Sequence, residues 1–208
     1  SRLGMDYVQQ YGYYQHEVVT RTSQQPTATS FDSNADLLIA KSISLESQPT
    51  ELQMSFGRAV AIGKMTVKNS HRRSLVLGVE FTAPDKKVTG RSYVDMTAGT
   101  VKEYGYPGNF SDNVTLSYSS EMNLKANGAT GMTAYFTCFP FEVAAGETFT
   151  VTVTTASKIF TKTVTVQEAG PWPFAAGRQF DFRGRYDRRC GRGERNIERR
   201  LRHHGDQS

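Results

Sequence analysis

The chain lacks long apolar runs and the common motifs of enzyme chemistry. No stretch of about 18 apolar residues occurs among its 208 residues, so we expect no transmembrane helix. Its two cysteines, Cys138 and Cys190, allow at most one disulfide and form no CxxC pair. The four histidines lack a metal-binding spacing such as HExxH, and neither a GxSxG elbow nor a P-loop is present. These absences weigh against the enzyme classes that such motifs mark.

A hydrolase with two catalytic carboxylates stays open, because such acids meet only in the folded protein. Most acids of the body, however, follow turn signals or occupy outward strand positions, as Glu80 does between Val79 and Phe81. Cys138 lies among aromatics in AYFTCFPF, which favours a buried, inert thiol over a nucleophile. We therefore expect no enzyme activity, no cofactor and no metal site.

The net charge of +5 belongs to one end of the chain. Residues 1–177 contain 15 basic and 15 acidic residues and are neutral as a whole. Residues 178–208 contain ten Arg, no Lys and five acidic residues, which accounts for the entire excess. The body therefore offers no net positive charge to a nucleic acid or an acidic membrane surface.

The clearest structural signal lies in residues 148–166, TFTVTVTTASKIFTKTVTV. Phe149, Val151 and Val153 alternate with threonines, which places three apolar side chains on one face of a strand. A short TAS turn follows, and a second β-branched run returns. This pattern predicts a β-hairpin, which needs partner strands to be stable in water.

Similar alternation recurs through the body with turn signals between the runs. A phase change at Gly63 suggests a bulge or a bend in its strand. The series predicts an all-β, antiparallel β-sandwich of about seven to nine strands. We expect the core to contain Leu77, Val79, Phe81, Phe136, Phe149, Val151 and Val153.

Composition divides the chain into three parts. Residues 1–30 are rich in Tyr, Gln, Thr and Ser, and end in the polar SQQPTATS segment, which reads as a linker. Residues 31–176 hold the alternating strands and form the expected sandwich. Residues 177–208 form an Arg-rich tail, for which we expect disorder or an out-of-frame origin.

The order of the strands resembles that of fimbrillins, the Mfa-like subunits and tip adhesins of type V pili in Gram-negative anaerobes. The resemblance covers roughly residues 36–177 and rests on strand patterns in sequence rather than on catalytic signatures. The stretches that carry it are FGRAVAIGKMTVKN at 56–69, GVEFTA at 78–83, VTGRSYVDMTAGTV at 88–101, VTLSY at 114–118, AYFTCFPF at 134–141 and FTVTVTTASKIFTKTV at 149–164.

This resemblance implies a transthyretin-like, Greek-key sandwich in a structural or adhesive protein of the outer-membrane surface. Its partners would be other pilus subunits and, for an adhesin, surface ligands of a host or another bacterium. Such subunits are exported as lipoproteins, an arginine-specific protease removes an N-terminal strand, and a strand of the next subunit replaces it. The lipidated cysteine and the second β domain of the family have no counterpart in these 208 residues.

If this processing occurs, Arg21 is the expected site, because it precedes the polar SQQPTATS segment. Arg2 is the alternative site, and an ordinary surface arginine is the other interpretation of Arg21.

The Arg-rich tail allows three interpretations. It resembles an Arg/Gly nucleic-acid-binding segment, with Tyr186 available for stacking. It is otherwise a solvated tail, or the product of a frameshift after about Gly177. We favour the frameshift, because codons exist for which the shifted frame begins GNSTFAVDMTG, a plausible last strand. A carbohydrate-binding sandwich is a further functional alternative, which differs from a pilin mainly in its surface aromatics.

Overall fold

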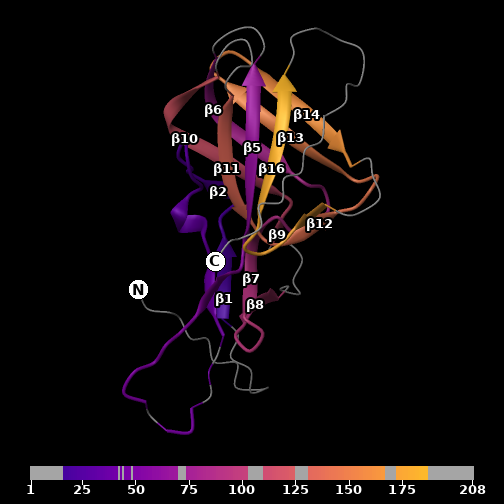
Figure 1. Ribbon diagram of the computed structural model, residues 1–208. Helices are drawn as coiled ribbons and strands as arrows, with labels where there is room; N and C mark the ends of the chain where they lie inside the picture. Colours follow the sequence, from indigo (N-terminus) through magenta and orange to yellow (C-terminus); the bar gives the residue numbers. More distant parts are fainter. Residues whose placement is uncertain are drawn as a thin grey trace.

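Nearly all of the regular structure is β, as the alternating pattern predicts. The computed structural model describes residues 16–41, 43, 45–47, 49–69, 74–102, 110–124, 131–166 and 172–186 (Figure 1). One short 3-10 turn, η1 (Ser33–Ala35), accompanies the strands in this part of the chain. No helix in the described ranges is long and apolar enough to cross a membrane.

The strands fall into long sheet strands and short edge pairs, which is why they outnumber the seven to nine that the sequence predicts. In chain order they are β1 (His16–Thr20), β2 (Ser23–Gln24), β3 (Leu38–Ala40), β4 (Phe56–Arg58), β5 (Ala61–Asn69), β6 (Ser74–Thr82), β7 (Thr89–Asp95), β8 (Thr100–Lys102), β9 (Phe110–Ser111), β10 (Asn113–Leu124), β11 (Met132–Cys138), β12 (Phe141–Val143), β13 (Thr148–Thr155), β14 (Ile159–Thr165), β15 (Trp172–Phe174) and β16 (Gln179–Tyr186).

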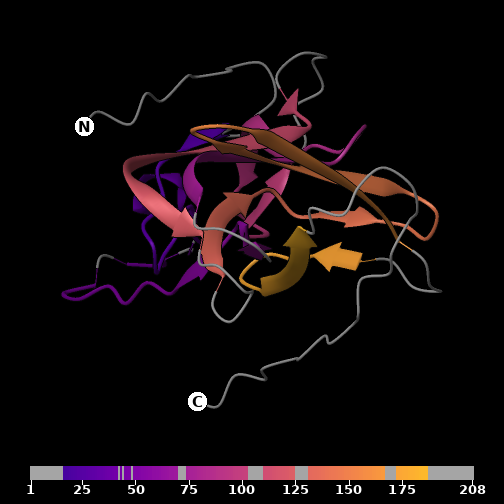
Figure 2. The ribbon, with the colours of Figure 1, turned by 90° about the horizontal axis from the view of Figure 1, so that it is seen from above.

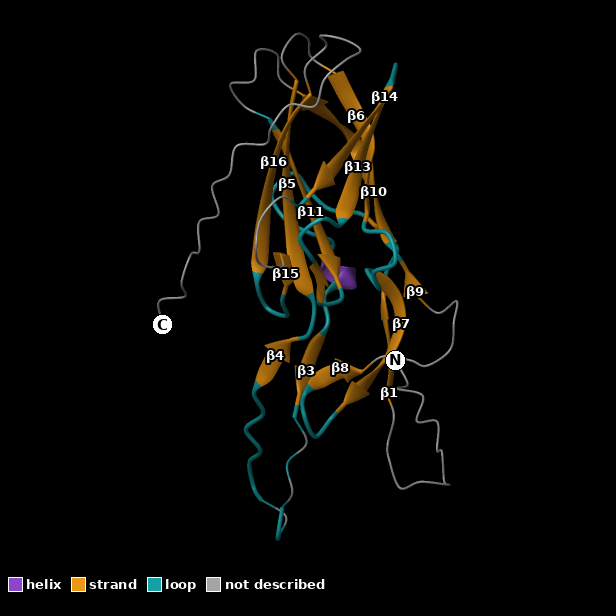
Figure 3. Cartoon of the chain, turned by 90° about the vertical axis from the view of Figure 1, so that its right-hand side faces the viewer, coloured by secondary structure: helices purple, strands orange, loops and turns teal. Residues whose placement is uncertain are grey.

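Two sheets face each other in the upper part of the molecule, and their layers are visible from the side and from above (Figures 2 and 3). One has five strands in the order β14-β13-β6-β10-β2, and the other has three in the order β11-β5-β16. Most pairs are antiparallel, but β2 runs parallel to β10 and β16 runs parallel to β5. The expected all-β sandwich is confirmed.

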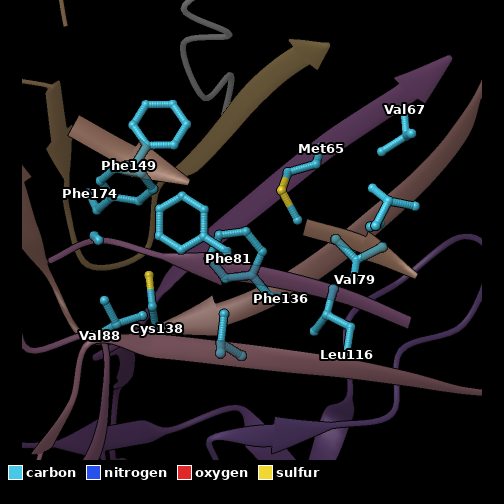
Figure 4. Close-up of a cluster of buried hydrophobic side chains, with 14 of the residues drawn as sticks. Met65, Val67, Val79, Phe81, Val88, Leu116, Phe136, Cys138, Phe149 and Phe174 are labelled. Atoms are coloured by element: carbon cyan, nitrogen blue, oxygen red, sulfur yellow. The ribbon is translucent and has the colours of Figure 1, made fainter. Parts of the chain in front are cut away.

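The main core fills the space between these two sheets. Phe81 of the larger sheet stacks on Phe136 of the smaller one, with 5.0 Å between the ring centroids (Figure 4). Phe149 and Phe174 pack on the same Phe81 ring at 5.5 and 5.9 Å. All four rings are buried, and each contributes its whole apolar surface to the stability of the fold.

The hairpin predicted in residues 148–166 is present as β13 and β14. The two strands pair antiparallel from Thr148–Thr165 to Thr154–Ile159. Phe149 and Val153 are buried and Val151 is partly buried, so the predicted apolar face is the one that meets the core. On the other face, the hydroxyls of Thr150 and Thr163 lie 3.1 Å apart, and a second threonine pair follows along the ladder.

Leu77 is the one predicted core residue that the structure places outside. Val76, Val79 and Phe81 are buried, whereas Leu77 is 44% exposed. The register of β6 shifts between Val76 and Gly78 in its pairing with both neighbouring strands. Such a shift inserts a residue and reverses which face the following side chains occupy. The placement of Leu77 in the core is therefore wrong.

Gly63 does not mark a bulge. It lies opposite Phe136 in the pair of β5 and β11, and the register continues through it without a shift. A Cβ atom at Gly63 would overlap the ring of Phe136. The position requires glycine because the Phe136 ring lies across the strand, so the expected bend at Gly63 is wrong.

A smaller group of strands forms the lower part of the molecule. β7 pairs with β1 on one side, and with β8 and β9 on the other. β3 and β4 form a separate pair at the base of a long connection (Figure 3). A second, smaller apolar cluster lies here, built around Ile39, Ala59 and Val94.

The N-terminal boundary expected at residue 31 is wrong. β1 pairs with β7, and β2 pairs with β10. Gln24 is fully buried although it lies in the polar segment expected to be a linker. Hydrogen bonds to the buried amide allow this polar residue inside, which is why composition misplaced the boundary.

The C-terminal boundary expected at residue 176 is also too early. β16 continues beside β5 from the Gln179–Ile62 pair to the Tyr186–Asn69 pair. Phe180 packs on the core, with its ring 5.0 Å from that of Phe174. The expected disorder is therefore wrong for β16. Residues 187–208, which include Cys190, lie outside the described part of the chain.

Candidate assembly site

β1 is a short strand at the edge of the lower sheet. Its five residues pair antiparallel with β7, from His16–Val94 to Thr20–Gly90. β8 and β9 pair with the opposite side of β7, so β1 covers the remaining side of that strand (Figure 3). The backbone N–H and C=O groups of β7 on this side depend on β1 for their partners.

The inner face of β1 rests on the small apolar cluster of the lower sheet. Val18 is partly buried and packs there, whereas Val19 is 54% exposed. The strand thus contributes one apolar side chain to the cluster and leaves another in water. Its companions in the cluster are Leu37, Ile39, Ala59, Val94, Met96 and Val101.

Thr20, two residues after Val18, points inward as well. Its side chain is fully buried, and its Oγ1 atom has no hydrogen-bond partner. A buried hydroxyl without a partner destabilises the folded state by roughly 1–3 kcal/mol. β1 therefore leaves one buried polar group unpaired in its position beside β7.

Arg21, the predicted processing residue, lies between β1 and β2. Its side chain is exposed, and its carbonyl oxygen accepts a hydrogen bond of 2.9 Å from the Gln24 side-chain amide. Arg21 thus lies at the junction between β1 and the segment that is bonded to the sandwich. Arg2 lies outside the described residues.

The chain just after Arg21 is firmly attached to the sandwich. The carbonyl of Thr22 accepts a 2.7 Å hydrogen bond from the Thr115 N–H, and its hydroxyl lies 2.9 Å from that of Thr89. Gln24 then forms two hydrogen bonds with the backbone of Thr137 in β11. Cleavage after Arg21 would leave these contacts intact.

Asp32 fixes the turn that follows this anchor. Its carboxylate accepts hydrogen bonds of 3.0 Å from the Gln25 N–H and 2.9 Å from the Asn34 N–H. Burial pushes the pKa of Asp32 upward, but these hydrogen bonds and the charge of Arg21 outweigh it, so the pKa lies below its ordinary value. The ionised carboxylate therefore stabilises the segment that anchors the N-terminal strands.

The described residues gather no group of three or more side chains suited to hold a metal ion. Cys138 is a free, fully buried thiol, and desolvation raises its pKa well above the ordinary value. A thiol in that state is a poor nucleophile. The expected buried position of Cys138 is confirmed.

Most aromatic side chains whose burial the structure describes are buried or half-buried. Among these aromatic residues, Phe56 alone has an exposed side chain. The outer face of β13 and β14 carries threonine hydroxyls in place of rings. A sugar-binding platform of stacked aromatics is thus not formed on that face.

Neither the family models nor the curated proteins searched give a match for this chain. What the chain does is therefore argued from its own residues and geometry.

The sequence pointed to Arg21, but it did not reveal the two buried residues on either side of it, Thr20 and Gln24. A buried glutamine inside a Gln, Ser and Thr run has no signal in hydrophobic periodicity, because its partners lie 113 residues away. The orphaned hydroxyl of Thr20 also depends on tertiary packing. The run of three β-branched residues from Val18 to Thr20 is the local sign of a strand here.

Proposed function

We propose that this protein is a fimbrillin-like structural subunit of a filament on the cell surface, whose copies join by strand exchange at the β1 site. The observation that supports this function is an edge strand joined to the body through an exposed arginine. It acts outside the cell, with other pilus subunits as its partners, and adhesion to host or bacterial surfaces would be a further role of the same filament.

Cleavage after Arg21 turns β1 into a separate peptide. In the described part of that peptide, five paired residues, the inward side chains of Val18 and Thr20, and the hydrogen bond from Gln24 to the Arg21 carbonyl hold it. A single short strand with so few contacts binds weakly. Once β1 leaves, the side of β7 that it covered presents unpaired backbone groups beside the apolar cluster around Ile39 and Val94. A strand from another subunit can add there through backbone hydrogen bonds, with alternate side chains entering the apolar site.

The body would survive this loss because the contacts of Thr22 and Gln24 lie after the cut. The strand that leaves, β1, ends at Thr20, and the residues that stay bonded to the sandwich, Thr22 and Gln24, follow directly after the cut. A neutral body without a net basic charge gives no support to nucleic-acid binding as the main function.

Treatment of the full chain with an arginine-specific protease tests the proposal. We expect a new N-terminus at Thr22, followed by a rise in molar mass measured by light scattering as cut subunits join. The matched control is Arg21→Lys, which keeps the charge but removes the arginine that the protease recognises. We expect this variant to keep β1 and to show no such rise.

Two outcomes would contradict the proposal. One is cleavage within the sandwich while the Arg21–Thr22 bond remains intact. The other is a correctly cut protein, confirmed by N-terminal sequencing, whose molar mass after β1 has dissociated does not rise above that of the uncut chain at the same concentration.

A further inference from the structure

β3, the start of β4 and the extended connection between them carry most of the exposed large apolar side chains of the described residues. We call residues 38–56 the arm; it projects from the lower end of the molecule, away from the two facing sheets (Figures 1 and 3). Six of the nine large hydrophobic residues that are exposed lie on it. They are Leu38, Ile43, Leu45, Leu52, Met54 and Phe56, each 45–61% exposed.

The last part of the arm has the pattern of a strand without a partner. Leu52, Met54 and Phe56 recur every second residue, with Gln53 and Ser55 between them. In an extended chain the three apolar side chains share one face and the two polar ones the other. Phe56 pairs with Ala40 in the β3–β4 ladder, but residues 51–55 belong to no strand of the described chain.

The opposite end of the molecule offers an open sheet edge. β14 is the last strand of the five-stranded sheet, and no described strand pairs with its outer side. β14 begins at Ile159, which is 69% exposed. Like the six residues of the arm, it is one of the nine exposed large hydrophobic residues. An edge of this kind is a template for another strand.

The two faces of β14 resemble those of the arm segment, except that Lys162 lies between Phe160 and Val164 on the inner face. Thr161 and Thr163 form hydroxyl contacts with β13 on the outer face. Phe160 and Val164 are partly buried and pack against the main core on the inner face. A strand added beside β14 with apolar residues on one face and small polar residues on the other would extend both the core-facing apolar face and the threonine face of the sheet.

Charge is complementary between the two surfaces. The arm contains two acidic residues, Glu46 and Glu51, and one basic residue, Lys41, so it is acidic on balance. Residues 156–166, which contain β14, carry Lys158 and Lys162 and no acidic residue. Such complementarity guides the encounter of two copies and disfavours wrong partners. It also argues against lipid as the occupant, because the ESQPTE tip of the arm at 46–51 is polar and acidic.

From this complementarity we infer that residues 51–56 of one copy add as a strand to the β14 edge of a second copy. Leu52, Met54 and Phe56 extend the apolar layer of Phe160 and Val164. Gln53 and Ser55 extend the threonine face.

The arm and β14 lie at opposite ends of the molecule (Figures 1 and 3). The contact is therefore head-to-tail and leaves a free arm and a free edge at the two ends of every assembly. It goes beyond the strand exchange proposed above, because cleavage after Arg21 changes neither surface.

Sedimentation velocity of the uncut full chain over a range of concentrations tests the inference. We expect the wild type to self-associate, and Leu52→Asp with Met54→Asp to weaken association about tenfold or more. Gln53→Asp with Ser55→Asp is the matched control, since it adds the same charge to the same segment but spares the apolar face. All four positions lie on an unpaired stretch, so thermal unfolding should be unchanged and separates lost contact from lost fold.

A charge exchange identifies the acceptor. Lys158→Glu with Lys162→Glu should weaken self-association, and so should Glu46→Lys with Glu51→Lys. A mixture of these two proteins should associate, because each reversed surface meets a complementary one. A monomeric wild type at every concentration, wild-type association of the Leu52 and Met54 variant, or a mixture no stronger than either variant alone would overturn the inference. These results are independent of the protease experiment, which uses cleavage and the β1 site.

Discussion

The side-chain amide of Gln24 binds the backbone of Thr137 as a neighbouring strand would. Its Nε2 donates a 2.8 Å hydrogen bond to the Thr137 carbonyl, and its Oε1 accepts a 2.9 Å bond from the Thr137 N–H. Both residues are fully buried. On the side of β11 away from β5, where no described strand pairs, Gln24 supplies hydrogen-bond partners for the N–H and C=O of Thr137. The same two bonds fix the N-terminal segment to the sandwich.

We expect Gln24→Ala to reduce the free energy of unfolding by about 2–4 kcal/mol, because a buried N–H and a buried C=O lose their partners together. Urea denaturation followed by circular dichroism measures the change. Gln25→Ala, next to it but with an exposed side chain, should stay within about 0.5 kcal/mol of the wild type. Equal stability of the two variants would show that the amide does not hold the segment.

Two leucines on neighbouring strands should differ sharply when truncated. Leu116 in β10 is fully buried, and Leu77 in β6 is 44% exposed. We expect Leu116→Ala to destabilise the protein by about 2–5 kcal/mol and Leu77→Ala by less than about 1 kcal/mol. Because both substitutions remove the same atoms, chemical denaturation of the pair tests the bulge that turns Leu77 outward. A larger effect at Leu77 would contradict the register of β6.

The alternation of apolar and polar residues predicts the sandwich and its hairpin, since those strands are half buried and the pattern records burial directly. It fails at Leu77, where one inserted residue reverses the faces of β6 without any local sign in SLVLGVEFT. It also fails at Gly63, whose reason is a ring on another strand. Contacts between distant strands decide both positions, so a single sequence does not show them.

The tail was misjudged for a different reason. Its arginine content suggested a chain without strands, yet Phe180 and Phe182 alternate with polar residues in QFDF, at the start of β16. Composition averaged over 31 residues concealed this short pattern. The frameshift hypothesis for residues 178–208 stays a prediction: an uninterrupted reading frame in the gene would refute it.

Acid should weaken the anchor of the N-terminal strands through Asp32. Its pKa lies below its ordinary value in the folded protein, so its ionised form contributes stability above the pKa of the unfolded chain, and the contribution is lost as the pH falls through the folded pKa. We expect Asp32→Asn to be less stable than the wild type at neutral pH and to approach it at the acid end. Urea denaturation between about pH 7 and pH 3 measures both curves.

The control for Asp32 is Asp112→Asn, which removes an exposed carboxylate elsewhere on the surface. Loss of this exposed carboxylate should change the free energy of unfolding at neutral pH by less than about 0.5 kcal/mol. A constant difference between Asp32→Asn and the wild type down to the lowest pH would mean that the hydrogen bonds of Asp32 matter and its charge does not.

Thr20→Val should strengthen the hold of β1 on β7. Valine has nearly the shape of threonine, so it fills the same buried site but removes the hydroxyl that lacks a partner. We expect a gain of about 1 kcal/mol in the free energy of unfolding.

If strand exchange begins with loss of β1, this variant should release the β1 peptide more slowly after cleavage at Arg21, and polymerise more slowly in proportion. The matched substitution Val19→Thr changes the exposed neighbour on the opposite face and should leave both rates unchanged. Faster release of β1 from Thr20→Val would show that the threonine hydroxyl holds the strand in place.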